Sequence, residues 1–360
     1  MATPEPSTTV AVIGAAGPLG RRVVARVAAD PDVARVVAVD RHRGPAPAVA
    51  TAAPVERIVA DPSAPGAERW LAGVDDLVYL APTTRDAPGA DGTGTGSSSA
   101  EDLDALLRAA DAVGVTHLVV LSSATVYGAD ADNPVPLTEA APVRPAPGVH
   151  LAEARAELEA RAERWGGDGP DRTVARLRPA IAVGPETRRW FARSPWAAVP
   201  ARTDEGPPLQ LVHLDDLADA VAVARRHHLD GPANVAPAEW LAADEVAALA
   251  GPAGRFRGVA RLLERLRPGA RAAPEDLVGT PYERFPWVVA SDRLRSVGWS
   301  PRSTRAEAFV EVDDPGPLGT VSARRRQQLS LGVVGGVVAG LAVAAAVLWR
   351  RRVRGATASR

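Results

Sequence analysis

The residues best suited to bind a charged ligand form a glycine-rich loop, GAAGPLG, at positions 14–20. Gly14 permits a tight turn, Gly17 lets a pyrophosphate lie against the backbone, and Gly20 lets the following helix pack closely on a sheet. Pro18 suits the first turn of that helix, where its missing N–H costs nothing. The free N–H groups and partial positive charge of the helix N-terminus would face phosphates. The loop therefore predicts a phosphate-containing ligand.

The segments on either side make this loop specific. The apolar run Val10–Ile13 predicts a buried parallel strand, and an apolar stripe with helical spacing follows the loop. A second apolar run, Val36–Val39, ends in Asp40. An acid about 20 residues after such a loop is placed to accept hydrogen bonds from an adenosine ribose. Together these features predict dinucleotide binding rather than a structural turn.

Four motifs resemble the extended branch of the short-chain dehydrogenase/reductase superfamily, the NAD-dependent epimerase/dehydratase family. They are the G-x-x-G-x-x-G spacing of the loop, LSSATVYG at 121–128, LRPAIAVGP at 177–185 and VHLDDLA at 212–218. The resemblance covers roughly residues 9–310. It implies an NAD cofactor and a nucleotide sugar or similar hydroxyl or carbonyl compound as substrate. In the last motif, Asp215 or Asp216 is expected to cap a helix.

The resemblance also assigns roles to single residues. Ser123 would be the catalytic serine that polarises a substrate carbonyl or hydroxyl, and Thr125 would line the substrate site. Asp61 matches an acid near the adenine ring, although a turn residue ahead of Pro62 is an equal alternative. The residues expected to contact the cofactor are Gly14, Gly17, Leu19, Gly20, Asp40, Arg41, Asp61, Leu80, Ala81 and Pro179.

The sequence departs from the family at its catalytic pair, a Tyr and a Lys four residues apart on one helical face. All 42 basic residues are Arg, and none of the three Tyr lies on this helix. Alignment on residues 156–159 puts Leu151 at the Tyr position and Arg155 at the Lys position. Arg155 can hold a ribose hydroxyl, but its guanidinium stays protonated and Leu151 cannot transfer a proton. We therefore expect a retained cofactor site, a degenerate catalytic site, and His150 as a poor substitute.

The alternation of strand and helix patterns predicts an α/β fold, a Rossmann-type doubly wound parallel sheet with a smaller C-terminal substrate domain. The segments expected along the chain are a disordered tail at 1–8, an NAD(P)-binding Rossmann domain at 9–185 that also receives 209–238, a substrate domain at 186–208 and 239–310, a linker at 311–328, a transmembrane helix at 329–349 and a basic tail at 350–360.

Residues 329–349 are apolar apart from Ser330, and clusters of Arg flank them. About 20 such residues span the ~30 Å hydrocarbon core of a bilayer as a helix. Glycines at 332, 336 and 340 form a face that could pair two helices into a homodimer. The N-terminus lacks a secretory signal, so we expect a single-pass cell-membrane protein with a cytoplasmic globular domain. The Arg-rich tail favours the cytosol too, so its side of the membrane stays open.

Composition narrows the possible functions. A net charge of −1 argues against a nucleic-acid partner, and the absence of Cys excludes disulfides and thiolate chemistry. The six His lack zinc-ligand spacing, so no metal is expected. NADP stays open beside NAD, because Asp40 repels a 2′-phosphate whereas Arg41 and Arg43 could bind one. Two functions remain: a membrane-tethered oxidoreductase or epimerase with a nonstandard proton donor, or a non-catalytic NAD(P)-binding sensor or scaffold at the membrane.

Overall fold

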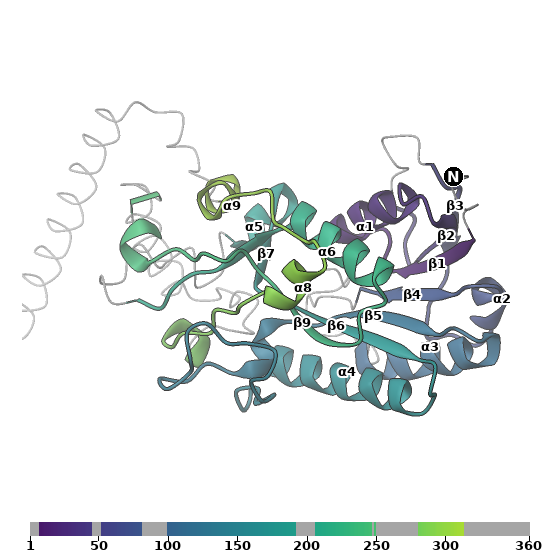
Figure 1. The fold of residues 1–360 in the computed structure, drawn as a ribbon, viewed down its shortest axis with the longest axis horizontal. Helices are drawn as coiled ribbons and strands as arrows, with labels where there is room; N and C mark the ends of the chain where they lie inside the picture. The colour runs from purple at the N-terminus through teal and green to yellow at the C-terminus, as the bar shows by residue number, and fades with distance from the viewer. Residues whose placement is uncertain are drawn as a thin grey trace, which may run out of the picture.

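The computed structural model describes residues 7–44, 52–80, 99–191, 206–246, 248–249 and 280–312, and its central feature is a seven-stranded sheet (Figure 1). The strand order is β3-β2-β1-β4-β5-β6-β9, and every pairing is parallel. The strands are β1 (Thr8–Ile13), β2 (Val33–Asp40), β3 (Val55–Val59), β4 (Asp76–Tyr79), β5 (His117–Leu121), β6 (Thr173–Pro179) and β9 (Gly231–Val235). A small second sheet pairs β7 (Ile181–Val183) with β8 (Leu211–His213).

Helices cover both faces of the large sheet (Figure 1). One face carries α1 (Pro18–Ala28) and α6 (Leu214–Arg226), and the other carries α2 (Glu68–Leu71), α3 (Ser99–Val113) and α4 (His150–Gly167). Further helical segments among the described residues include η1 (Ala124–Tyr127), η2 (Pro185–Thr187), α5 (Arg188–Phe191), η4 (Pro281–Glu283), α8 (Asp292–Ser296) and α9 (Arg305–Val312). This arrangement confirms the predicted doubly wound parallel sheet.

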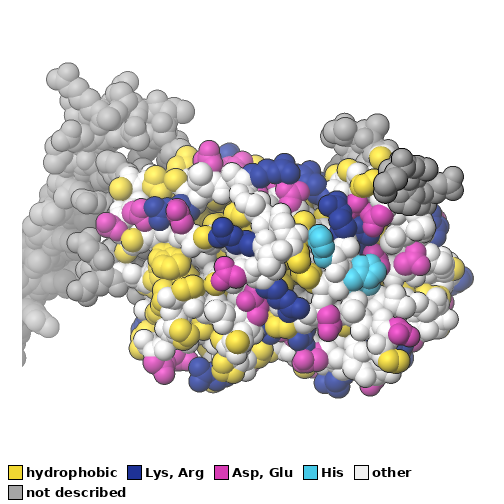
Figure 2. All heavy atoms as spheres, in the orientation of Figure 1, with side chains coloured by type: hydrophobic (Ala, Val, Ile, Leu, Met, Phe, Trp, Pro, Cys, Tyr) yellow, Lys and Arg dark blue, Asp and Glu magenta, His cyan; other side chains and the backbone are white. Residues whose placement is uncertain are grey.

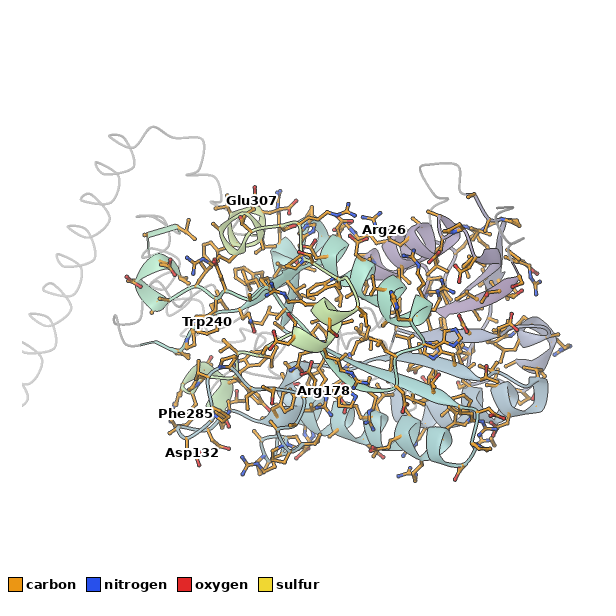
Figure 3. All side chains as sticks on the ribbon, viewed as in Figure 1. Arg26, Asp132, Arg178, Trp240, Phe285 and Glu307 are labelled. Carbon is orange, nitrogen blue, oxygen red and sulfur yellow. The ribbon has the colours of Figure 1, made fainter. Side chains whose placement is uncertain are left out.

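Alternate residues of each strand enter different hydrophobic layers. In β1, Val10 and Val12 pack with α1 and α6, whereas Ala11 and Ile13 pack with α2 and α3. Because both faces are covered, the inner strands of the sheet need apolar side chains on both faces. The predicted strands therefore appear as continuous apolar runs rather than as alternating patterns. The two helices on one face are also joined by an ion pair. Arg26 of α1, which is labelled in Figure 3, donates to Asp219 of α6 at 2.5 Å.

A second hydrophobic cluster lies beyond the carboxyl ends of β5, β6 and β9 and forms the smaller part of the fold. It contains residues of β7, β8, α5, η4 and α9, among them Phe191, Tyr282 and Phe309. Val289 of this part forms only an isolated parallel bridge to Leu137. Leu137 follows a prolyl residue, and a residue without an N–H cannot extend such a ladder.

Several predicted features lie outside the described residues. They are Ala81, most of the segment 239–279, the linker beyond residue 312, the segment 329–349 and the tail 350–360. Among the helices that the structure describes, none combines the length and the apolar character needed to cross a bilayer. On the face shown in Figure 2, acidic and basic side chains are interspersed.

Helix α6 begins with a cap that differs from the prediction. His213, not Asp215 or Asp216, is the N-cap residue, and its ring accepts a hydrogen bond from the Asp215 N–H at 3.2 Å. Asp216 instead accepts bonds from the backbone N–H groups of Arg302 and Ser303. The acid thus joins α6 to the segment that precedes α9.

A cluster of charged and polar side chains occupies the amino-terminal edge of the sheet. The fully buried Arg225 donates to Asp30 at 2.8 Å, to Asp32 at 2.9 Å and to Asp76 at 3.2 Å.

The ring of His117, at the start of β5, stacks on that of His228 with centroids 4.6 Å apart. Burial, with the charges of His228 and Arg225, lowers the pKa of His117 to about 3. His117 is therefore neutral in the folded protein.

This depressed pKa predicts an acid-sensitive fold. Unfolded His titrates near pH 6.5, so the unfolded chain binds more protons than the folded one below that pH. Stability should fall as the pH drops from 7 to 5, and His117 alone should account for about 2 kcal/mol of the unfolding free energy. Urea unfolding at pH 7 and at pH 5 measures this loss of unfolding free energy.

His117→Gln should flatten this pH dependence, whereas His227→Gln, at an exposed position, should keep it. Equal losses in the parent and in His117→Gln would contradict the assignment.

Candidate functional site

The predicted site residues gather along the carboxyl edge of the sheet. Between β1 and β4 the strand order changes direction, and ligands of open α/β sheets bind in the crevice at such a point. The residues that the structure places at or just beyond strand ends on this edge are Gly14 after β1, Asp40 at the end of β2, Asp61 after β3, Leu80 after β4, Ser123 after β5 and Pro179 at the end of β6.

The glycine loop packs so closely that side chains would not fit. Gly14 has a φ of 85°, and a Cβ there would lie 2.8 Å from the carbonyl oxygen of Leu80. A Cβ on Gly20 would lie 2.0 Å from the carbonyl oxygen of Gly14. Gly17 is the N-cap of α1 and provides no side-chain cap, so the first N–H groups of the helix can receive a phosphate. Leu19, by contrast, packs against the hydrophobic layer beneath α1.

Asp40 braces this loop from the end of β2. Its Oδ2 accepts the N–H of Ala16 at 2.9 Å, and its Oδ1 accepts the N–H of His42 at 3.0 Å. A carboxylate has about four acceptor positions, so Asp40 can still accept bonds from ribose hydroxyls. A hollow of about 320 Å³ beside it is lined in part by His42, Arg43 and Arg57.

Arg41 and Asp61 contact each other. The Nη2 of Arg41 donates to Asp61 at 3.0 Å and to Asp102 of α3 at 2.9 Å. β3 ends at Val59, and Asp61 lies in the turn that follows. There it also accepts bonds from the N–H and hydroxyl of Ser63. These contacts are those of a turn residue, the role that the sequence left open for Asp61.

Ser123 and Thr125 lie on the η1 turn after β5. The Ser123 hydroxyl accepts the Thr125 N–H at 3.2 Å and is the side-chain cap of the turn. Thr125 is buried, and its hydroxyl has no hydrogen-bond partner among the described residues. Its carbonyl accepts the Tyr282 hydroxyl at 2.5 Å. A residue of the smaller part thus fixes the turn that carries Ser123.

Arg155 is buried beneath the same strand end. Its Nη1 donates to the carbonyl oxygen of Leu121 at 3.0 Å, two residues before Ser123. Burial lowers the pKa of Arg155 to about 10, against the opposing influence of Tyr79. The guanidinium still carries its charge at neutral pH, and the structure gives it no carboxylate partner among the described residues. The fold thus brings Arg155 to the strand end that leads into Ser123.

The two predicted positions on α4 before Arg155 differ in exposure. Leu151 is half-buried and packs against the second hydrophobic cluster. His150 is the first residue of α4, its side chain is 91% exposed, and its Nδ1 lies 3.6 Å from a carboxylate oxygen of Glu153. An imidazole turned to solvent at the helix start is poorly placed for proton transfer beside Ser123.

A buried network at this edge was missed by the sequence analysis. Arg178 donates to Glu159 at 2.5 Å and to the Tyr127 hydroxyl at 2.8 Å, and Tyr127 donates to Asn234 at 2.7 Å. Figure 3 shows Arg178 where β6 lies over α4. Burial raises the pKa of Tyr127, so its hydroxyl stays neutral. The network fixes η1, α4, β6 and β9 relative to one another. Tyr127 and Arg178 both lie within quoted motifs, which is the signal that could have found them.

Comparison with known proteins agrees with this geometry. The model of the NAD dependent epimerase/dehydratase family matches residues 10–236. No curated protein sequence matches the chain significantly.

Solved structures share the fold. The dTDP-glucose 4,6-dehydratase DesIV from Streptomyces venezuelae, with NAD and TYD bound, superposes with a TM-score of 0.63 at 19% identity, over 87% of this chain and 98% of that one. The UDP-glucose 4-epimerase of Thermus thermophilus, in complex with NAD, gives 0.62 at 21% identity, over 86% and 98%. MoeE5 in complex with UDP-glucuronic acid and NAD gives 0.58 at 21%, over 84% and 97%.

The close packing at Gly20 gives a test of the loop. Gly20→Ala should weaken NADH binding by about tenfold or more, because the new Cβ must displace the backbone of Gly14. Gly73→Ala is the matched control: its φ of 70° is also strained for Ala, but nothing lies within 4 Å of the new Cβ. That variant should lose about 1 kcal/mol of stability and keep its NADH affinity. Equal NADH affinity in Gly20→Ala and the parent would show that the loop is only structural.

Proposed function

Because the chain belongs to the NAD dependent epimerase/dehydratase family, we propose that it binds NAD along the carboxyl edge of the sheet and acts on, or recognises, a nucleotide sugar. The observation that carries this proposal is the glycine loop. Its backbone leaves no room for a Cβ at residues 14 and 20 and leaves the start of α1 uncapped by a side chain. The three solved structures described above all contain NAD, and that of MoeE5 also contains UDP-glucuronic acid.

The residues present fit a dinucleotide. The loop and the α1 N-terminus would hold the pyrophosphate, and Asp40 would hold the adenosine ribose. When bound, the nicotinamide supplies hydride acceptance and donation. Pro179, the last residue of β6, would pack against the nicotinamide. Ser123 would orient a substrate hydroxyl or carbonyl. Arg155 would add a fixed positive charge beneath the same site.

We propose further that the proton-transfer step is impaired. The chain contains no Lys, and Leu151 presents a hydrocarbon where the family has a Tyr. General acid–base help of this kind contributes about 10²–10⁴ in rate. Arg155 keeps its proton at neutral pH, because a pKa of about 10 lies well above it. A bound substrate would therefore be held and oriented but turned over slowly.

The same observations support a second candidate, a non-catalytic NAD-binding sensor or scaffold at the membrane. The proposed tether is the segment 329–349, whose apolar composition and flanking Arg favour a spanning helix. We propose that the globular part is cytoplasmic, where NAD is available. Binding without turnover would favour this candidate over a slow enzyme.

The catalytic deficit is tested by measuring binding and turnover together. The parent should bind NADH and show little turnover on a panel of UDP- and dTDP-sugars. Leu151→Tyr with Arg155→Lys should raise turnover by about tenfold or more if the substrate pocket is intact. His150→Ala is the control and should change neither quantity, because that side chain is 91% exposed. Fast turnover by the parent that is lost in His150→Ala would contradict the proposal.

The tether is tested by extraction. Membranes containing the full chain should retain it in high salt and at alkaline pH, whereas a chain truncated after residue 322 should be recovered in the soluble fraction. Release of the full chain by salt alone would mean that its Arg clusters bind lipid headgroups and that 329–349 does not span.

A further inference from the structure

The two neighbours at the end of β2 face different partners. Asp40 turns to the glycine loop, where it accepts the Ala16 N–H. Arg41 turns the other way, and a single nitrogen of its guanidinium contacts two carboxylates, those of Asp61 and Asp102. The Asp102 side chain is only 4% exposed, whereas that of Arg41 is 41% exposed. A buried carboxylate of α3 therefore holds a half-exposed cation that follows β2.

This contact bears on the choice between NAD and NADP. NADP differs by a phosphate on the adenosine 2′-oxygen, and an Arg just after the acid at the end of β2 is the side chain best placed to bind it. Asp40 opposes such a phosphate by charge. Arg41 offsets that repulsion less well while its guanidinium is held by two carboxylates, because they neutralise its charge and fix its position.

We propose that Asp102 is a positioning residue that selects NAD over NADP by holding Arg41 away from the 2′-position. The proposal rests on the proposed cofactor site. The two carboxylates that Arg41 contacts, those of Asp61 and Asp102, carry more negative charge than its guanidinium can neutralise, so the group as a whole does not attract a 2′-phosphate. Burial opposes the charged form of Arg41, but its bonds to Asp61 and Asp102 outweigh this and raise its pKa. Arg41 therefore carries its charge at physiological pH.

The hollow beside Asp40 carries a competing set of cations. His42, Arg43 and Arg57 line it, and Arg57 also donates to the Gly44 carbonyl oxygen at 3.4 Å. If these cations bound the 2′-phosphate, the parent would prefer NADPH. The measured quantity must therefore be the ratio of NADPH to NADH affinity.

The test is Asp102→Asn in the full-length protein, with NADH and NADPH titrated separately by fluorescence. Removing one of the two carboxylate charges leaves Arg41 held by Asp61 alone, so the NADPH-to-NADH affinity ratio should rise about tenfold, the effect of roughly one charge-assisted hydrogen bond. The gain should shrink in high salt, because Arg41 is half-exposed. Asp104 lies on α3 like Asp102 but pairs with Arg161 of α4. Asp104→Asn is therefore the matched control and should leave the ratio unchanged.

A double variant separates positioning from a general change of charge. Arg41→Gln added to Asp102→Asn should remove the gain, whereas a nonspecific effect of charge would keep it. Asp61→Asn releases the other carboxylate and should shift the ratio in the same direction, which provides a second test if Asp102→Asn folds poorly.

The outcomes are distinct. A parent that binds neither NADH nor NADPH overturns the proposed function. A parent that prefers NADPH, or ratios unchanged in folded Asp102→Asn and Asp61→Asn, overturns the role of Asp102 and leaves dinucleotide binding intact.

Discussion

The close contact between Gly20 and the carbonyl oxygen of Gly14 determines where the first helix begins relative to the first strand. Only hydrogen can stand at position 20, since a Cβ would lie 2.0 Å from that oxygen. Gly14 in turn lies against Leu80, which follows β4. The loop therefore joins β1, α1 and β4 at the point where the strand order of the sheet changes direction. The first N–H groups of α1, which no side chain caps, lie at that same point.

Buried charges fix the two edges of the sheet. At the carboxyl edge, Glu159 and Arg178 pair within the network that holds η1 in place. At the amino edge, Arg225 pairs with three carboxylates. Removing one partner of a buried pair leaves a charge without compensation, so such pairs constrain geometry more than they add stability. One edge thereby positions the residues of the candidate site, and the other holds β2, β4 and α6 together.

Arg155 is the residue on which the proposed loss of proton transfer depends. Its guanidinium binds a backbone carbonyl at the end of β5. The position still supplies a cation under Ser123, yet neither it nor Leu151 can exchange a proton near neutral pH. In the proposed function, binding and proton transfer therefore depend on different residues, which is why we propose that the first is retained and the second is lost.

Local patterns in the chain were enough to predict the main elements and the edge of the sheet on which the site lies. Apolar runs predict parallel strands, the glycine spacing predicts the loop, and LSSATVYG places Ser123 after β5. Which side chains meet could be seen only in the folded molecule. Arg41 contacts Asp61 and Asp102, and His213 rather than a neighbouring acid caps α6. Such contacts depend on the register of strands and helices far apart in sequence, which no local pattern specifies.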